Sequence, residues 1–202
     1  RFQAGMSAPY RRQIKRRYKL GLDLRNENWQ VRNSFAGPAP LLSGLNLRRE
    51  AVNASLTTLE GGTWSWSATT EFSHRDYRNL FQESSLTPDL LSQGFQLKET
   101  LRVDADLWRI PERRMTFSGD AAADVGRLWS SPSHAFTQLR ASGVWHWLPL
   151  ADSDDYETRE TLHIGKTLGE IPFDEQFMLG IGGDNDLLMR GHIATRNGRK
   201  GT

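Results

Sequence analysis

The most constraining feature of this sequence is a strict alternation of apolar and polar residues over long stretches. Over residues 95–107, every even-numbered residue is polar and all but one of the odd-numbered residues are apolar. The same period of two runs through residues 13–24, 62–73 and 115–125. A period of two places successive side chains on opposite faces of an extended chain. These stretches therefore predict β-strands with one apolar face and one polar face.

Together with weaker stretches of the same pattern, about seven strands are expected. The strong strands would be about 10 to 14 residues long, which exceeds the roughly 5 or 6 residues typical of soluble sheets and suits a tilted membrane crossing. No convincing helix pattern interrupts them. The expected strands are about residues 12–25, 46–60, 63–77, 94–109, 113–129, 135–149 and 157–170, followed by a loop at 171–202.

The connections between these strands alternate in length. Tight turns are expected at residues 61–62 and 110–112, whereas residues 26–44 and 78–92 are expected to be long polar loops. Short turns on one side and longer loops on the other are typical of an up-and-down barrel in the outer membrane. Counting onward, the segment after about residue 170 falls on the side of the long loops.

The composition agrees with a barrel wall. Hydrophobic residues make up 37% of the chain, and no stretch approaches the roughly 18 consecutive apolar residues of a membrane-spanning helix. A helical membrane protein is therefore excluded, whereas a barrel strand needs an apolar side chain only at every second position. The Trp64/Trp66 and Trp145/Trp147 pairs near strand ends are typical of lipid interfaces, with packing in a core as the alternative.

These patterns favour an all-β fold, an antiparallel up-and-down transmembrane β-barrel, with residues 1–202 forming part of that one domain. The chain begins without an initiator Met or a signal peptide and ends without a closing strand, so we expect an interior fragment of a longer protein. The alternative is a soluble β-sandwich or a lipocalin-like binding module, whose sheet also has one wet face.

One segment carries a motif. It runs from Ile171 to His192, and its distinctive residues are Pro172, Phe177, Leu179, Gly180, Gly182, Gly183, Arg190 and Gly191. It resembles the conserved loop of the BamA/TamA-type bacterial surface antigen family and its two-partner secretion relatives, in which P-x-x-x-x-F-x-x-G-G leads into (V/L)-R-G-(F/Y). The resemblance covers about 20 residues in motif terms. An extra residue sits in the glycine run, Met189 replaces Val or Leu, and His192 replaces the aromatic residue.

The resemblance implies a loop that folds back into the barrel lumen. There Arg190 would reach acidic and aromatic residues on the inner wall, because a guanidinium presents a planar fork of donors to a carboxylate. Gly191 would give the backbone room beside it. In the family the receiving strands lie downstream, so we expect the partner of Arg190 beyond Thr202. The implied motif residues are Phe177, Gly180, Gly182, Gly183, Arg190, Gly191 and His192. An ordinary flexible hairpin with a solvated arginine is the alternative.

The resemblance also implies a function and a location. Members of this family are non-enzymatic pores in the bacterial outer membrane, which help to insert outer-membrane proteins or to translocate a passenger protein. The expected partners are outer-membrane lipid, unfolded client proteins and periplasmic domains of the same chain. The alternatives are another outer-membrane barrel, either passive and porin-like or hydrolytic, and the soluble modules named above.

The sequence gives little support to metal binding, hydrolase activity or nucleic-acid binding. The chain has no cysteine, and its five histidines form no ligand pattern, so no metal or other cofactor is expected. The acidic turn at 152–157 lacks the glycine and the distant Glu of a calcium loop. No Gly-x-Ser-x-Gly elbow indicates a hydrolase. The basic run at 11–17 lies within a strand pattern, so nucleic-acid binding is not expected.

Overall fold

The computed structural model confirms an all-β chain. It describes residues 1–10, 13–32, 41–81, 91–130, 133–150, 155–179 and 199–200. Eight antiparallel strands form a single sheet in which every strand pairs with its neighbours in the sequence, so the order is β1-β2-β3-β4-β5-β6-β7-β8. The strands are β1 (Phe2–Tyr10), β2 (Gln13–Arg32), β3 (Leu41–Glu60), β4 (Trp64–Phe81), β5 (Gly94–Ile110), β6 (Met115–Trp129), β7 (His134–Trp147) and β8 (Thr158–Gly169).

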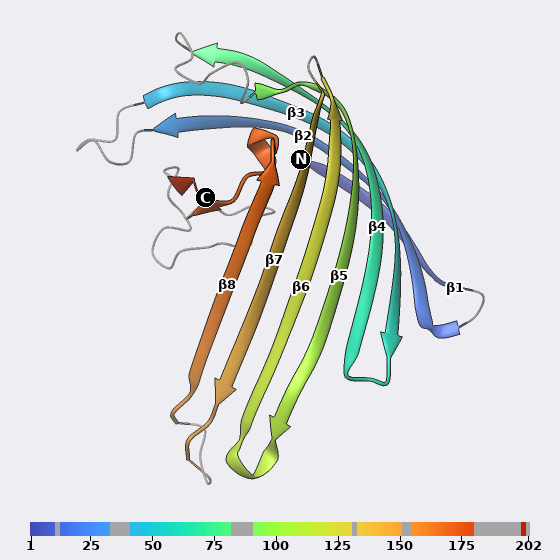
Figure 1. Cartoon of the computed structure of the whole chain (residues 1–202), viewed down its shortest axis with the longest axis vertical. Coiled ribbons are helices and arrows are strands. Elements are labelled where there is room, and N and C mark those ends of the chain that lie inside the picture. The colour runs from blue at the N-terminus through green and yellow to red at the C-terminus, as the bar shows by residue number, and fades with distance from the viewer. Residues whose placement is uncertain are drawn as a thin grey trace.

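The sheet is strongly curved and has a convex and a concave face (Figure 1). Two short 3₁₀ turns, η2 (Pro111–Arg113) and η3 (Phe173–Glu175), accompany it, and a small ladder joins β9 (Met178–Leu179) to β10 (Arg199–Lys200). In the part of the chain that the structure describes, no helix is long and apolar enough to cross a membrane.

The seven expected strands correspond to β2 through β8, and β1 was not expected. Its residues do alternate, and Phe2, Ala4 and Met6 pair with Leu24, Leu22 and Leu20 of β2. The signal is weak because alanine, serine and glycine fill half of the remaining positions. Pairing with a long neighbouring strand therefore decides the structure of this segment, and its own sequence contributes less.

The prediction of a loop at residues 26–44 is wrong over most of that range. Strand β2 continues to Arg32 and β3 begins at Leu41, so the long ladder between them includes Asn26 and Asn28 opposite Arg48 and Asn46. Asn46 Nδ2 donates hydrogen bonds to Asn26 Oδ1 at 2.6 Å and to Asn28 Oδ1 at 2.9 Å. The strands thus continue beyond the apolar rows with polar outward positions, which the sequence pattern does not distinguish from a loop.

The convex face carries the apolar rows that the alternation predicts. Side chains there remain open to the surroundings, for example Leu101 at 53% and Ile164 at 60% of their full exposure. No second sheet or helix covers these rows in the part of the chain that is described. The exposed apolar side chains of the strands include Met6, Leu20, Leu22, Leu24, Val52, Phe72, Phe95, Leu97, Leu101, Val103, Val125, Leu139, Leu162, Ile164 and Leu168.

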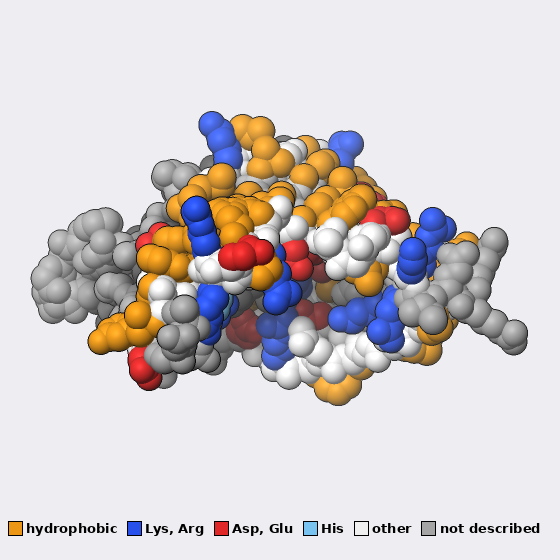
Figure 2. All heavy atoms as spheres, turned by 90° about the horizontal axis from the view of Figure 1, so that it is seen from below, with side chains coloured by type: hydrophobic (Ala, Val, Ile, Leu, Met, Phe, Trp, Pro, Cys, Tyr) orange, Lys and Arg blue, Asp and Glu red, His pale blue; other side chains and the backbone are white. Residues whose placement is uncertain are grey.

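The concave face is polar along most of its length. Viewed from the end with the short turns, hydrophobic side chains lie around the outside and charged side chains gather in the hollow (Figure 2). At the opposite end, a small apolar core forms on this same face. Leu45, Leu47 and Tyr77 are buried there, and Trp29 and Phe173 pack against them. This core places η3 against the inner side of β2, β3 and β4.

Candidate functional site

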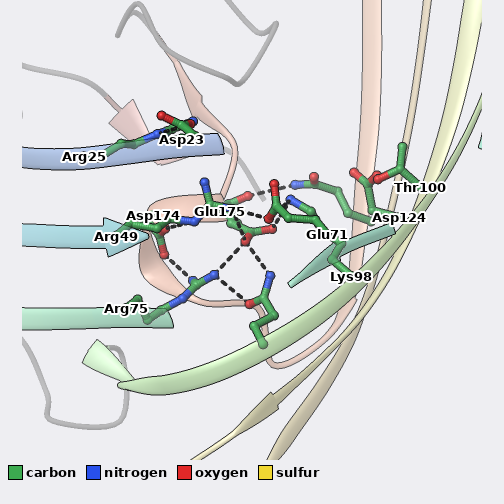
Figure 3. Close-up of polar contacts among 12 residues, drawn as sticks. Asp23, Arg25, Arg49, Glu71, Arg75, Lys98, Thr100, Asp124, Asp174 and Glu175 are labelled. Atoms are coloured by element: carbon green, nitrogen blue, oxygen red, sulfur yellow. Dashed lines mark hydrogen bonds and ion pairs between the residues drawn. The ribbon is translucent and has the colours of Figure 1, made fainter. Parts of the chain in front are cut away.

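The chain turns back after β8 and lies on the concave face of the sheet. We call residues 171–177 the inner segment; it contains η3 and is flanked by the end of β8 and by β9. Its carboxylates, Asp174 and Glu175, point into a group of charged side chains that come from several strands (Figure 3). Without the inner segment, these charged side chains would face the open hollow of the sheet. The inner segment covers them and supplies binding partners.

Three arginines lie side by side on the concave face next to the inner segment. Arg25 of β2 is directly opposite Arg49 of β3, which is directly opposite Arg75 of β4. Like charges at opposite positions on one face destabilise a sheet unless carboxylates separate them. This arginine row (Arg25, Arg49 and Arg75) therefore requires acidic partners.

Carboxylates of the sheet form ion pairs with the first two arginines of the row. Arg25 Nη2 donates to Asp23 Oδ2 at 2.6 Å, within the same strand. Arg49 donates to Glu71 across the β3–β4 pair. No described carboxylate of the sheet forms an ion pair with the third arginine, Arg75.

Arg75 is completely buried, and the inner segment supplies its counter-charges. Its Nη1 donates to Asp174, and its Nη2 donates to Glu175 Oε1 at 2.7 Å. A further bond from Nη2 reaches Gln96 Oε1 of β5 at 2.7 Å. A buried guanidinium without a paired carboxylate is costly by several kcal/mol, so these two bonds are the strongest constraint on the position of the segment.

Glu175 is bound from three directions. Gln96 Nε2 donates to Oε1 at 2.7 Å, and Lys98 Nζ donates to Oε2 at 3.0 Å, beside the bond from Arg75. Burial by itself raises the pKa of the Glu175 carboxyl, but the charges of Lys98, Arg75 and Arg49 outweigh that effect and hold the pKa well below its ordinary range. The Glu175 carboxyl is therefore still ionised below the ordinary glutamate pKa.

Asp174 ties the same segment to β3 and β4. The hydroxyl of Tyr77 donates to Asp174 Oδ1 at 2.7 Å, while the backbone N–H of Asp174 donates to that hydroxyl oxygen at 3.3 Å. Arg49 Nε lies 4.0 Å from Asp174 Oδ2. Asp174 is thus held by charge on two strands and by a reciprocal pair of hydrogen bonds with one tyrosine.

The inner segment adds negative charge to a part of the concave face where cations outnumber anions among the described residues. The cations there are the arginine row, Lys98 and Arg1, and the anions are Glu71 and Asp23, which Arg1 and Arg25 share. Asp174 and Glu175 supply two negative charges. Beside them lies a polar cavity of about 210 Å³, whose lining also includes Arg140, Asp124 and Gln138. Gln138 Nε2 donates to the carbonyl oxygen of Glu175 at 2.9 Å.

Aromatic side chains fix the segment at both of its ends. Phe173 packs against Trp29 of β2, with ring centroids 5.8 Å apart. Phe177 is buried against β8 at Gly165, where an added Cβ would lie 2.5 Å from the phenyl ring. Only a glycine at position 165 leaves room for that ring.

The motif expected from the sequence lies partly within the described residues. Phe177 is on the concave face and buried, and Pro172 precedes the first residue of η3. Gly180, Gly182, Gly183, Arg190, Gly191 and His192 lie outside the residues that the structure describes, so the predicted docking of Arg190 stays a prediction.

The sequence interpretation missed the residues that hold the inner segment: Arg49, Arg75, Gln96, Lys98, Asp174 and Glu175. It expected a loop arginine bound to carboxylates of the wall, and did not anticipate that loop carboxylates would also bind arginines of the wall. A usable signal existed, because Arg49 and Arg75 fall on the polar face of their strands and an Asp-Glu pair stands between Pro172 and Phe177.

The described residues contain no group of three or more His, Asp or Glu side chains that could hold a metal ion. What the arrangement offers is a buried attachment, made of ion pairs, between a loop and the concave face of a curved sheet. Comparisons with protein-family models, with curated proteins and with solved structures found no match to this chain.

Proposed function

We propose that this chain forms part of the wall and the internal plug of a bacterial outer-membrane β-barrel, which assists the insertion of outer-membrane proteins or the translocation of a passenger protein. The observation that carries the proposal is the difference in character between the two faces of one sheet. The convex face carries apolar rows that no other described element covers, and the concave face binds a returning loop through buried ion pairs.

The convex face supports a position in lipid. Leaving a large apolar side chain in water rather than burying it costs about 1.5–3 kcal/mol when the whole side chain is affected. Fifteen strand residues with partly exposed apolar side chains were named above, so a single uncovered sheet would be a poor solution in water. Lipid acyl chains would cover this surface without a second protein layer.

Aromatic side chains near both ends of the strands support the same interpretation. Trp64 and Trp108 lie toward the short turns, and Trp129 lies at the far end of β6; each has 43–46% of its surface exposed. Trp and Tyr are enriched where a membrane meets water, because an indole is apolar over its ring and polar at its N–H. Tryptophans at both ends of the sheet would lie at the two interfaces of a bilayer.

The inner segment favours an assembly or translocation pore over a passive porin. A passive pore needs an open hollow, whereas here a loop fills part of the hollow and is held there by several charge-assisted bonds. The position of this segment agrees with the resemblance of residues 171–192 to the lumen loop of the BamA/TamA-type family. The soluble β-sandwich is the weaker alternative, since it requires a second layer over the convex rows.

Site-directed labelling tests the membrane part of the proposal. The chain has no cysteine, so single substitutions can carry a spin label without a background. We expect a label at Leu101→Cys, on the convex face, to be accessible to oxygen dissolved in lipid. A label at Ser65→Cys, opposite Asp104 on the concave face, should be accessible to a water-soluble nickel complex. Water access at both positions, with the full-length protein in vesicles, contradicts a barrel wall.

A folding assay tests the function itself. Vesicles that contain the full-length protein should accelerate the insertion of a small, separately denatured outer-membrane protein, measured by the heat-modifiable shift of the folded client on a gel. Vesicles with the same lipid and an unrelated barrel are the control. Equal client folding in both, combined with the expected labelling pattern, would leave a passive barrel as the better description.

A further inference from the structure

A row of exposed cations lies on β2, toward the end of the sheet that carries the short turns. Lys15, Arg17 and Lys19 stand at alternate positions there, and we call them the basic strip. Arg17 and Lys19 share the concave face with Asp23, because even numbers of positions separate them from it in one regular ladder, and Lys15 continues the same alternation. All three side chains are exposed, and the function proposed above does not use them.

The immediate neighbours of the basic strip are uncharged. The residues directly opposite Arg17 and Lys19 are a threonine and a serine on β3, and a proline and a serine on β1. No described carboxylate forms an ion pair with the strip. Asp23, the nearest carboxylate of the same strand, is already bound by two arginines. Glu60, at the end of β3, is directly opposite Trp64 and belongs to the convex face.

The acidic residues of the facing wall lie too far away to neutralise the basic strip. Asp104 and Asp106 belong to β5 and Asp120 to β6, and Arg102 binds both Asp104 and Asp120. β5 is three strands from β2, which is roughly 14 Å along the sheet. Exposed charges separated by more than about 8–10 Å are largely screened at physiological ionic strength. The strip therefore presents a local excess of positive charge to the hollow.

The spacing of the basic strip suits an extended polypeptide. Its members are two residues apart in a strand, which gives a repeat of roughly 6.7 Å. Alternate side chains of any extended peptide repeat at the same distance, so an acidic residue at every second position places one carboxylate beside each cation. The hydroxyl groups beside the strip can donate hydrogen bonds, whereas the apolar rows that would hold an acyl chain lie on the opposite face of the sheet.

We propose that the basic strip binds an extended, acidic polypeptide segment that carries carboxylates at alternate positions. The inference rests on the proposed function, because the passage of unfolded protein brings such a segment to this face of the sheet. It goes beyond that function by naming the chemistry of the segment and the side chains of the wall that bind it.

Two peptides of equal composition test the inference. The alternating peptide is Ser-Glu-Ser-Glu-Ser-Glu-Ser and the spaced peptide is Glu-Ser-Ser-Glu-Ser-Ser-Glu, both with blocked ends and the same uncharged dye. Binding to the full-length protein in detergent micelles is measured by fluorescence anisotropy. The alternating peptide should bind about fourfold more tightly, because it matches two more cations and each exposed ion pair contributes about a factor of two. The preference should disappear in about 1 M salt.

Charge variants identify the side chains that bind the peptide. Arg17→Gln combined with Lys19→Gln should weaken binding of the alternating peptide about fourfold and remove its preference over the spaced peptide, whereas Arg17→Lys should keep that preference. Arg159→Gln is the matched control. Arg159 is exposed on the concave side of β8, but the alternate positions on either side of it carry Glu157 and Thr161, so it belongs to no row of cations.

The outcomes separate the basic strip from the function on which it rests. Equal affinity for the two peptides, or equal loss in the double variant and in Arg159→Gln, overturns the strip even when vesicles with the protein accelerate the folding of a client. Selective binding that the double variant abolishes supports the strip. A failed client-folding assay beside that selective binding counts against the insertion role alone.

Discussion

At the scale of single residues, the buried guanidinium of Arg75 decides how the concave face is organised. Its side chain has no exposed surface, and two carboxylates of the inner segment bind it. Arg75 lies on the concave face of β4, but its carboxylate partners stand about a hundred positions later in the chain. No local pattern encodes that pairing, because it depends on the curvature of the sheet and on the path of the chain after β8.

Neutralising Glu175 should reveal the cost of leaving these cations unpaired. We expect Glu175→Gln to lower the free energy of unfolding by about 3 kcal/mol, since Arg75 and Lys98 would lose a buried counter-charge. Denaturant titration of the folded protein measures the change. Glu50→Gln is the control, because its pair with Arg48 is about half exposed and should contribute less than about 1 kcal/mol. Similar losses in both variants would contradict a structural role for the inner segment.

The depressed pKa of Glu175 predicts how stability changes with pH. In the folded state, the pKa of the Glu175 carboxyl lies below the ordinary glutamate value of 4.5. Its contribution to stability is therefore complete above that value and is lost as the pH falls below it. Denaturation midpoints in the native protein should decline more steeply under acid conditions than in Glu175→Gln. Parallel curves for the two proteins would show that Glu175 does not carry this dependence.

At the scale of elements, the alternation of side chains predicted β2 through β8, because each of them contains a run in which apolar residues recur at alternate positions. The ends of strands were less predictable. Beyond the apolar rows the outward residues of β2 are polar, and hydrogen bonds such as those of Asn46 continue the ladder there. The inner segment was predicted only in part: Phe177 was identified from a motif, whereas the three-residue turn η3 carries no periodic signal.

The contact between Gly165 and Phe177 joins the inner segment to β8 and can be tested as a pair. Gly165→Ala should displace the phenyl ring and expose residues 171–177 to limited proteolysis, because the added methyl group would overlap the ring. In a Phe177→Leu background the same alanine should be tolerated better, since the smaller side chain leaves space for it. A double-mutant cycle measures the coupling. Additive effects would indicate that the two residues act independently.

At the scale of the whole molecule, no described residue outside the eight-stranded sheet covers its convex face. A charged substitution there distinguishes lipid from water as the surroundings. Leu101→Arg should reduce folding in vesicles by about 2–4 kcal/mol if the position faces the bilayer interior, but an exposed site in water would tolerate it within about 0.5 kcal/mol. Ser65→Arg, on the concave face opposite Asp104, is the control. Equal folding yields for the two variants would argue against a lipid-facing position.

If the chain forms the wall of a pore as proposed, the ion pairs of the inner segment have a consequence for ion flow. With the inner segment in place, its two carboxylates bind Arg75 and Lys98. Withdrawing the segment would remove two negative charges from a wall in which cations outnumber anions among the described residues, and a passage lined in this way attracts anions. The unplugged conformation should then conduct chloride in preference to potassium, so that a reversal potential would report whether the loop has left the wall.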